Sequence, residues 1–264
     1  MKILGHRGDG VSNKTPELRA LRKKQGKLPE NTLAGFKKVL AEGADGIEFD
    51  VVMSADGKAM VIHDDELSKH VEGASGLVSK TSCADLQKLN VGEGSKIPTL
   101  EEVIEASGKE KFLNVELKGE GSALPIARVI NQYARKGWNK ANFVVSSFKW
   151  DLLKEVRKAD MSLQVGVIFE PGEKIADIGK IVKEYSPYSL HPDFRDVTEA
   201  VLEDAKKHGL VVIAWMGGEN IEDHKSNAVA TKLANFIKKG YNLHIITDHP
   251  KLLREQVATL CKKD

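Results

Sequence analysis

Apolar residues recur along this chain in two patterns: short stretches that alternate with polar residues, and stripes spaced three or four residues apart. The segment 46–52 has the first pattern, with apolar residues alternating with the acidic Glu48 and Asp50. Residues two apart share one face of a β-strand, so we expect a strand with both carboxylates on one face. Adjacent carboxylates repel unless a cation lies between them or one stays protonated. The pattern therefore indicates a chemical site, whereas a solvent-facing polar edge is the alternative interpretation.

Seven other segments have the apolar pattern of short strands. These strands are predicted at 2–5, 111–117, 142–147, 164–169, 187–191, 210–215 and 243–247. Helices are predicted near 33–41, 82–89, 99–107, 122–136, 149–159, 174–185, 196–208, 226–239 and 250–261. Eight strands in alternation with helices predict a (β/α)8 TIM barrel of the α/β class. No linker or change in composition divides the chain, so residues 1–264 are expected to form one domain.

A tight-turn signal follows the acidic strand. Asp56-Gly57 predicts a β-turn, after which residues 59–64 have the pattern of a returning strand. This returning strand would form a small hairpin extension with 46–52 and would run antiparallel to the barrel strands, outside the barrel. His63, near its end, would then return toward the two carboxylates and could share a site with them.

A polar, basic insertion occupies residues 9–28, in the first βα loop of the predicted barrel. Within it, Thr15, Pro16 and Glu17 have the N-cap, the first-position proline and the first-turn acid that are typical of a helix start. Gly26 could end this helix. We expect a short helix on a mobile, solvated loop, although its basic side chains could also attract an anion.

Composition and charge exclude several classes of partner. The 264 residues include 40 Lys+Arg and 38 Asp+Glu, and a net charge of +2 gives no reason to expect nucleic acid or an anionic membrane as the main partner. Cys83 and Cys261 match no metal or redox spacing, so we expect reduced thiols in a reducing compartment. The polar N-terminal segment is unlike a signal peptide, and the chain has no run of apolar residues long enough to insert stably in a membrane. The expected location is cytoplasmic.

Charged residues gather at the predicted C-terminal ends of the strands, where barrels of this type carry their sites. Glu48, Asp50 and Glu116 form a set of oxygen donors without a nearby cysteine, which suits Mg²⁺ or Ca²⁺ better than zinc. Arg7 and Lys118 add positive charge, so the set describes a site for a phosphate bound through a metal. The alternative is an inward-facing cluster of salt bridges, which is costly when buried without a function.

Two histidines, His6 and His63, are placed near this set and could transfer protons, since imidazole titrates near neutral pH. The sequence lacks the Gly-x-Ser-x-Gly elbow, which weakens a serine-nucleophile interpretation. It also lacks the glycine-rich phosphate loops of nucleotide-binding and dinucleotide-binding proteins. Proton transfer at a phosphate is therefore the chemistry that these residues indicate.

The sequence resembles the glycerophosphodiester phosphodiesterase family, within the superfamily of phospholipase C-like phosphodiesterases. The stretches that carry the resemblance span nearly the whole chain, and any one alone is a weak signal. They are His6-Arg7-Gly8, Pro29-Glu30-Asn31-Thr32, residues 43–51, Asp56-Gly57, His63-Asp64, residues 97–102, Asn114-Val115-Glu116-Leu117-Lys118, Ser146-Ser147-Phe148 and Ile246-Thr247-Asp248-His249-Pro250. Together and in this order they are highly specific.

The resemblance implies a (β/α)8 barrel that hydrolyses glycerophosphodiesters to glycerol 3-phosphate and an alcohol. It implies acid–base catalysis by His6 and His63, binding of Mg²⁺ or Ca²⁺ by Glu48, Asp50 and Glu116, phosphate binding by Arg7 and Lys118, a supporting role in the substrate site for Glu30, and an aromatic wall near the glycerol from Trp215. Which histidine is the acid stays open, as does the nucleophile, which is either water or the hydroxyl of the glycerol itself.

Three departures from the family pattern are visible. The 9–28 insertion is longer than usual, Met216 stands where a threonine is common, and Ser68-Lys69-His70 replaces an arginine-threonine pair. The insertion lies beside the site and could alter substrate choice. We expect none of the three to touch the acid, the base or the metal ligands.

Two other functions compete with this interpretation. A lysophospholipase D-like activity on lysophospholipids would need an apolar groove, and the basic 9–28 insertion supplies few apolar residues. A non-catalytic barrel that binds a phosphorylated ligand could lose a histidine or a carboxylate, yet all five are present here. The alcohol part of the substrate, the preferred ion and the oligomeric state are not indicated by the sequence.

Overall fold

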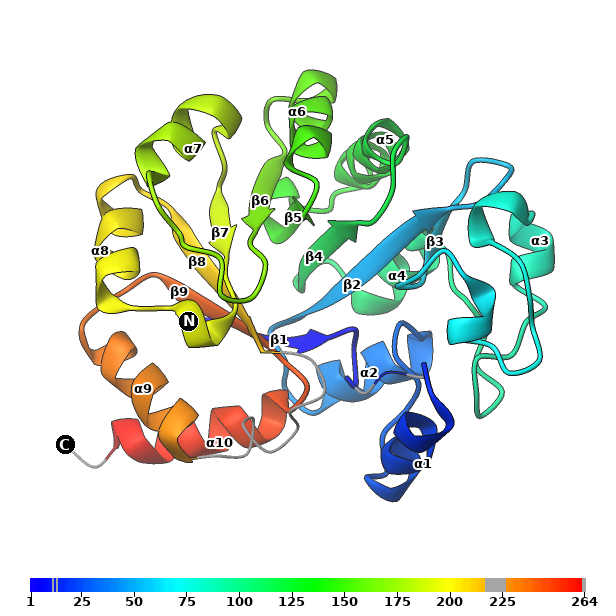
Figure 1. The fold of residues 1–264 in the computed structure, drawn as a ribbon, viewed down its shortest axis with the longest axis horizontal. Coiled ribbons are helices and arrows are strands. Elements are labelled where there is room, and N and C mark those ends of the chain that lie inside the picture. Colours follow the sequence, from blue (N-terminus) through cyan, green and yellow to red (C-terminus); the bar gives the residue numbers. More distant parts are fainter. Residues whose placement is uncertain (11, 13, 217–226, 263–264) are drawn as a thin grey trace.

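The computed structural model describes residues 1–10, 12, 14–216 and 227–262, and its strands form a closed parallel barrel (Figure 1). The barrel strands are β1 (Ile3–His6), β2 (Gly46–Met53), β4 (Phe112–Leu117), β5 (Phe143–Ser147), β6 (Gln164–Ile168), β7 (Ser189–His191), β8 (Val211–Met216) and β9 (Leu243–Thr247). Because β1 pairs in parallel with both β2 and β9, the sheet closes on itself. The predicted (β/α)8 barrel is confirmed.

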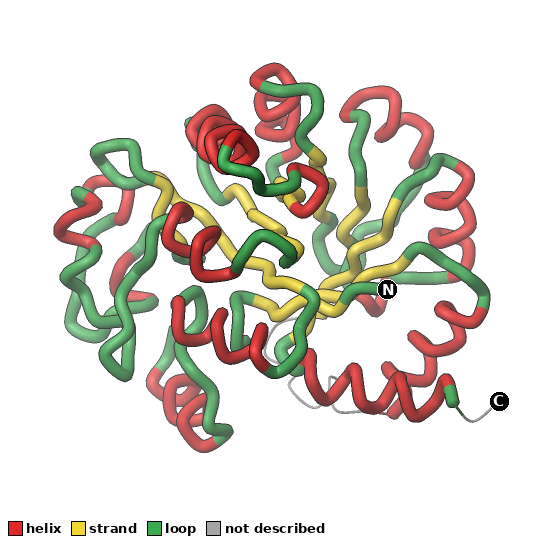
Figure 2. The backbone as a smooth tube through the Cα atoms, turned by 180° about the vertical axis from the view of Figure 1, so that it is seen from behind, coloured by secondary structure: helices red, strands yellow, loops and turns green. Residues whose placement is uncertain are grey.

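Helices cover the outside of the barrel, as the view from behind in Figure 2 also shows. They are α1 (Pro16–Lys24), α2 (Leu33–Ala41), α3 (Cys83–Leu86), α4 (Leu100–Ser107), α5 (Ala123–Arg135), α6 (Trp150–Ala159), α7 (Ile178–Tyr185), α8 (Glu199–Lys207), α9 (Asn227–Lys238) and α10 (Pro250–Cys261), with short 3-10 helices at Leu67–Lys69, Val78–Lys80, Lys140–Asn142 and Phe194–Asp196. Their apolar stripes pack on outward-facing strand residues, as Phe36 of α2 does on Phe49 of β2, with ring centroids 5.7 Å apart. Within the part of the chain that the structure describes, no helix is long and apolar enough to cross a membrane.

Strand alternation decides which side chains of β2 enter the barrel. The apolar residues of this strand belong to the core between strands and helices, so Glu48 and Asp50 project from the opposite face into the barrel. In the parallel register, Glu48 lies level with His6 of β1 and Asn114 of β4, and Asp50 lies level with Glu116. The pairing of three strands therefore brings the acidic residues and one histidine to two successive levels of the barrel, two residues apart along β2.

The hairpin after β2 is confirmed. The turn contains Gly57 with a φ of 74°, a left-handed conformation that glycine adopts at little cost, and β3 (Ala59–Val61) pairs antiparallel with the end of β2 outside the barrel. The strand is shorter than the predicted 59–64. One further bond joins the Ile62 N–H to the Asp50 carbonyl at 3.0 Å, and the chain then leaves the sheet at His63, which frees this side chain to face the barrel mouth.

The first βα loop packs against the barrel instead of lying free in solvent. Thr15 caps α1 as predicted, but Arg22 is buried, and its guanidinium donates to the Lys27 carbonyl at 2.9 Å and to the Glu93 carboxylate at 3.0 Å. The Lys27 ammonium in turn donates to the Asp248 carbonyl at 2.5 Å. The expectation of a mobile, solvated loop is therefore wrong for residues 14–28, because two of its basic side chains are buried anchors.

Two helices begin later than the sequence pattern indicated. Helix α7 starts at Ile178 and not near 174, because Asp177 takes a left-handed conformation with a φ of 53° and caps the helix by accepting from the Lys180 amide at 3.1 Å. Helix α8 starts at Glu199 and not at 196, because Thr198 is its N-cap. In both cases the capping side chain sets the helix start.

Candidate active site

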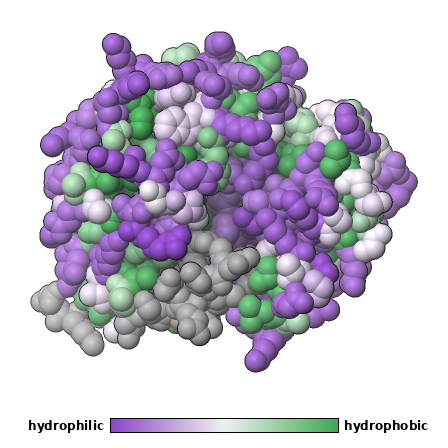
Figure 3. All heavy atoms as spheres, viewed as in Figure 1, coloured by the Kyte–Doolittle hydropathy of each residue, from purple (hydrophilic) through white to green (hydrophobic). Residues whose placement is uncertain are grey.

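The C-terminal ends of the strands surround a cavity of about 200 Å³. Figure 3 shows a hollow near the middle of a largely hydrophilic face. Its lining consists of His6, Arg7, Glu48, His63, Asn114, Glu116, Lys118, Phe148, Ile168, His191, Trp215 and Ile246. Of the site residues predicted from the sequence, only Asp50 and Glu30 are missing from this lining, and both are buried behind it in contact with Arg7.

The three predicted metal ligands lie together. Glu48, Asp50 and Glu116 are all buried, and each offers a carboxylate oxygen within 4.8 Å of the others. The donor set is entirely oxygen, which hard cations such as Mg²⁺ and Ca²⁺ prefer. Asn31, which the sequence interpretation gave no role, donates its amide to Asp50 at 3.0 Å and so leaves fewer orientations open to that carboxylate.

Burial and mutual repulsion distribute the protons unevenly over this cluster. Burial, followed by the charge of Asp50, raises the pKa of Glu48 to about 8. Burial likewise raises the pKa of Glu116, and the charge of Asp50 adds to it. Burial alone would also raise the pKa of Asp50, but Lys118 and then Arg7 hold it well below its usual range. Near neutral pH the protein by itself therefore keeps a proton on Glu48, and a divalent cation would supply the positive charge that replaces it.

Arg7 is held in a strained position by several contacts. Its backbone is left-handed, with a φ of 48°, and this turns its N–H toward a Glu48 carboxylate oxygen at 3.0 Å. The guanidinium donates to Glu30 at 2.8 Å and lies 3.3 Å from Asp50. Such strain persists only where surrounding contacts enforce it, so the guanidinium is fixed at the cavity wall before any ligand arrives.

Lys118 lies on the other side of the carboxylates. Its ammonium is 2.9 Å from Asp50 and also contacts Glu116. Burial lowers the pKa of Lys118, but the charges of Asp50 and Glu116 outweigh this and raise it above its usual value. The lysine therefore stays charged, and with Arg7 it presents two permanent cations to the cavity.

His6 is oriented by a carboxylate from the far end of the sequence. Its Nδ1 lies 2.6 Å from Oδ1 of Asp248, the residue that follows β9. Burial lowers the pKa of His6, but the charge of Asp248 and the hydrogen bond to it outweigh burial, so the pKa is raised. The bond to Nδ1 leaves Nε2 as the ring nitrogen that can exchange a proton with a ligand.

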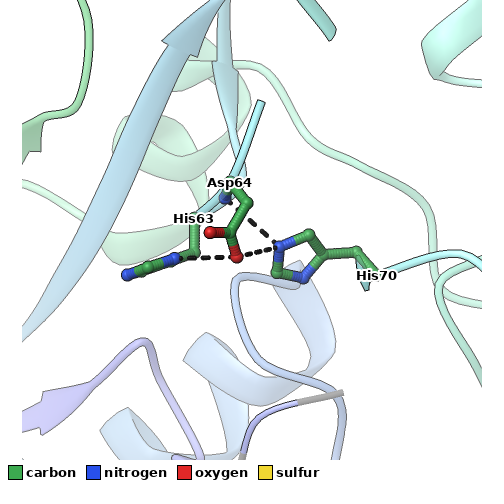
Figure 4. Close-up of side chains that lie close together, drawn as sticks. All are labelled: His63, Asp64 and His70. Atoms are coloured by element: carbon green, nitrogen blue, oxygen red, sulfur yellow. Dashed lines mark hydrogen bonds and ion pairs between the residues drawn. The ribbon is translucent and has the colours of Figure 1, made fainter. Parts of the chain in front are cut away.

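His63 also lies next to a carboxylate, but its pKa is lowered whereas that of His6 is raised. Its Nδ1 lies 3.0 Å from Oδ2 of the neighbouring Asp64 (Figure 4). Burial lowers the pKa of His63, and the nearby cations Arg7 and Lys118 lower it further, against the pull of Asp50 and Asp64. His6 and His63 therefore favour different protonation states.

An aromatic wall closes part of the cavity. The ring of Trp215 lies edge-on to Phe148, with centroids 6.4 Å apart, and its indole N–H donates to the His191 carbonyl at 3.1 Å. The buried His191 side chain lies 2.7 Å from the Ser189 hydroxyl. Burial, aided by His244, lowers the pKa of His191 to about 3, so this ring is neutral. The wall carries no charge of its own, and the Lys118 ammonium lies 5.8 Å from the centroid of its Phe148 ring.

Four polar residues around these groups had no role in the sequence interpretation: Asp64, Asp248, Asn31 and His70. A signal existed for Asp64, since it follows His63 directly, and for Asp248, since it ends the last strand motif. The pairing of Asp248 with His6 had no local signal, because the two lie 242 residues apart. His70 belongs to a departure from the family pattern that we expected not to touch the acid, the base or the metal ligands. It contacts Asp64 and Glu30, so it reaches the site through these two residues.

The arrangement can hold an anion and move two protons. Two permanent cations and a carboxylate cluster suited to a divalent ion face one small cavity, and two carboxylate-paired histidines line it. This combination can neutralise a phosphate, take a proton from an attacking hydroxyl and give one to a departing oxygen.

Comparison with known protein families agrees with this chemistry. The model of the glycerophosphoryl diester phosphodiesterase family matches residues 6–252. A glycerophosphodiester phosphodiesterase of Caldanaerobacter subterraneus subsp. tengcongensis is 30% identical over 263 residues, covering 95% of this chain and 95% of that protein. One of Bacillus subtilis is 24% identical and covers 82% of this chain and 84% of its own length.

Solved structures share the fold over nearly the whole chain. The glycerophosphodiester phosphodiesterase of Thermotoga maritima matches with a TM-score of 0.69 and 28% identity, covering 97% of each chain. A phosphodiesterase of Oleispira antarctica, solved in complex with the product sn-glycerol-3-phosphate, matches with a TM-score of 0.77 and 24% identity, covering 98% of this chain and 97% of that one. The second likeness concerns the fold alone.

Proposed function

The chain belongs to the glycerophosphoryl diester phosphodiesterase family, and on that premise we propose that it hydrolyses glycerophosphodiesters to glycerol 3-phosphate and an alcohol by a metal-dependent reaction with two catalytic histidines. The observation that carries the proposal is the shared cavity: His6 and His63, each paired with its own carboxylate, face the same space as Arg7, Lys118 and the acidic cluster. The Oleispira antarctica phosphodiesterase was solved with sn-glycerol-3-phosphate, the product that we propose for this chain.

Glu48, Asp50 and Glu116 would hold the divalent ion, Mg²⁺ or Ca²⁺. Their all-oxygen donor set and the proton that Glu48 keeps near neutral pH support this assignment. When bound, the ion supplies positive charge that polarises the phosphodiester and stabilises the charge that builds on its oxygens. Asn31 keeps Asp50 oriented, because its side-chain amide donates a hydrogen bond of 3.0 Å to the Asp50 carboxylate.

Arg7 and Lys118 would bind the phosphate oxygens, because both stay charged and both line the cavity. Glu30 supports this role from behind by accepting from the Arg7 guanidinium at 2.8 Å and so holds the guanidinium in place. Trp215 belongs to the uncharged aromatic part of the lining, where the carbon skeleton of the glycerol would fit.

We assign the base to His63 and the acid to His6. His63, whose pKa is lowered, starts neutral and can accept the proton of the attacking hydroxyl. His6, whose pKa is raised next to Asp248, starts protonated and can donate to the departing alcohol oxygen. Asp248 is hydrogen-bonded to Nδ1 of His6, and Asp64 lies 3.0 Å from Nδ1 of His63, so Nε2 of each ring is left for the transfer.

The cavity favours small polar substrates over lysophospholipids. A long acyl chain needs an apolar groove that continues from the site, but the face around the hollow in Figure 3 is largely hydrophilic. Turnover on glycerophosphocholine should therefore exceed turnover on lysophosphatidylcholine. The reverse order would favour the lysophospholipase D-like activity.

The decisive test is release of glycerol 3-phosphate from glycerophosphocholine and glycerophosphoethanolamine, with EDTA, with Mg²⁺ and with Ca²⁺. We expect EDTA to abolish release, one or both ions to restore it, and Glu48→Ala to prevent the restoration. The matched control is Glu155→Ala, which removes an exposed glutamate of α6 and should leave release unchanged. A folded wild-type protein that releases no product with either ion would overturn the proposed function; it would favour first the lysophospholipase D-like activity and, without turnover of lysophosphatidylcholine, a barrel that only binds a phosphorylated ligand.

A further inference from the structure

His70 is a buried histidine that the reaction above does not use. Its side chain is 3% exposed and lies between two carboxylates, with Nε2 at 3.0 Å from Oδ2 of Asp64 and Nδ1 at 3.3 Å from Oε1 of Glu30. The Asp64 backbone N–H also lies 3.2 Å from Nε2. Both ring nitrogens are therefore engaged. Nε2 either donates to the Asp64 carboxylate or, when unprotonated, accepts from the Asp64 backbone N–H, so His70 is tied to Asp64 in either state.

The two carboxylates lead to two different parts of the active site. Oδ2 of Asp64 is also 3.0 Å from Nδ1 of His63 (Figure 4). The second oxygen of Glu30 accepts from the Arg7 guanidinium at 2.8 Å. Among the described residues, His70 is thus the one that contacts both Asp64, the partner of His63, and Glu30, the partner of Arg7.

The same residues do not make a convincing second metal site. His63, Asp64 and His70 bring potential ligand atoms within 4.8 Å of one another, but a metal-bound imidazole must turn an unprotonated nitrogen to the ion. Here both nitrogens of His70 face carboxylate oxygens. Burial lowers the pKa of His70, but the bonds to Asp64 and Glu30 outweigh this and raise it, which favours a ring that donates to both.

We propose that His70 is a positioning residue for the reaction: through Asp64 it fixes the ring of His63, and through Glu30 it fixes the guanidinium of Arg7. The inference rests on the proposed function, since it assigns roles to His63 and Arg7. His70 lies within Ser68-Lys69-His70, a segment that departs from the family pattern. The connection that it makes between Asp64 and Glu30 is therefore a feature of this chain.

Other groups also touch the two carboxylates, but they are more exposed. Lys14 lies 3.2 Å from Oδ2 of Asp64, and Lys69 lies 3.4 Å from Oδ1, with side chains 35% and 43% exposed. The Ser12 hydroxyl donates to Glu30 at 3.2 Å. Exposed ion pairs are screened and contribute little. Among these contacts only those of His70 are buried and reach both carboxylates.

The test is a double-mutant cycle on glycerophosphocholine turnover with His70→Ala, Asp64→Asn and the double variant. We expect His70→Ala to lower kcat/KM by about tenfold to 10²-fold, the scale of a misplaced catalytic group. The fall in kcat should shrink markedly when Asp64→Asn is already present, because His70 acts on His63 only through Asp64. His70→Ala should also raise KM, because His70 acts on the phosphate-binding Arg7 through Glu30. This rise in KM should shrink when Glu30→Gln is already present. His70→Gln, which keeps one donor, should recover part of the loss.

A matched control and a readout independent of turnover complete the design. His208→Ala removes a solvent-exposed histidine of the α8 C-terminus and should change neither kcat nor KM. In protein labelled with ¹⁵N-histidine, the Nδ1–H of His63 should exchange faster with water in His70→Ala than in the wild type. Losses that are additive with Asp64→Asn, or an unchanged exchange rate, would overturn the inference. A wild type without turnover would reject the proposed function, and the exchange measurement would still decide the role of His70.

Discussion

His6 and Asp248 form a hydrogen bond of 2.6 Å although they lie 242 residues apart in the chain. The bond exists because β1 and β9 are neighbours in the closed barrel, with Gly5 level with Thr247. Each residue comes directly at the end of its strand, so barrel closure alone brings the imidazole to the carboxylate. The first strand and the last strand thus build one half of the proposed proton-transfer pair.

Asp248→Asn should weaken the proposed acid. Burial lowers the pKa of His6 and Asp248 raises it, so removal of the carboxylate lowers it, and the acid loses its proton at lower pH. We expect the basic limb of the kcat–pH profile to move to lower pH, with a fall in kcat of about tenfold to 10²-fold at neutral pH. Asp151→Asn, at an aspartate that is 88% exposed, is the control. An unmoved basic limb in Asp248→Asn would contradict the assignment.

The two histidines should respond differently to the leaving group. His6→Ala and His63→Ala should each reduce turnover of glycerophosphocholine by about 10² to 10⁴. A diester of glycerol 3-phosphate with 4-nitrophenol needs no proton on its departing oxygen, so His6→Ala should recover most of its rate on this substrate while His63→Ala should not. Circular dichroism would verify that both variants are folded. Recovery by His63→Ala alone would exchange the two roles.

Metal binding should release a proton near neutral pH. Burial and then the charge of Asp50 raise the pKa of Glu48 to about 8 in the protein alone, so a bound cation must displace that proton. Calorimetric titration of Mg²⁺ or Ca²⁺ at pH 7 in two buffers of different ionisation enthalpy should report about one proton released, and affinity should rise with pH up to about 8. Glu48→Gln should remove both the proton release and most of the affinity. A binding heat that is independent of the buffer would contradict this account.

Arg22→Ala should loosen the first βα loop. The buried guanidinium donates to the Lys27 carbonyl and to Glu93, and loss of these charged hydrogen bonds should reduce the free energy of unfolding by about 1–3 kcal/mol in urea titrations. Limited proteolysis should then cut between residues 14 and 28 sooner than in the wild type. Lys23→Ala, at the neighbouring lysine that is 68% exposed, should change neither result. Equal protease resistance in Arg22→Ala would show that the loop is held by other contacts.

Residue patterns predicted the secondary structure well where one physical signal dominates. The alternation in β2 predicted both the strand and the shared face of Glu48 and Asp50, because a strand must bury one face of its pleat. The Asp56-Gly57 turn likewise predicted the hairpin. The starts of α7 and α8 were placed too early, because the apolar stripe extends past the Asp177 and Thr198 caps that set the helix starts.

The pattern misled where burial depends on distant partners. A basic insertion normally indicates a solvated loop, yet Arg22 and Lys27 are buried, since Glu93 and the Asp248 carbonyl lie where they can accept from them. For the same reason the pattern did not indicate the contacts of His70 with Asp64 and Glu30. Nothing near it in sequence reveals that its ring would lie between Asp64 and Glu30.

The sequence by itself determined the barrel, the hairpin and the set of chemical groups, because strand alternation, turn residues and side-chain type are local properties. Only the tertiary structure decided which carboxylate orients which histidine, which groups are buried and therefore how their pKa values move, and that His70 connects Glu30 with Asp64. These properties depend on distances between residues that are far apart along the chain, and barrel closure and side-chain packing set those distances.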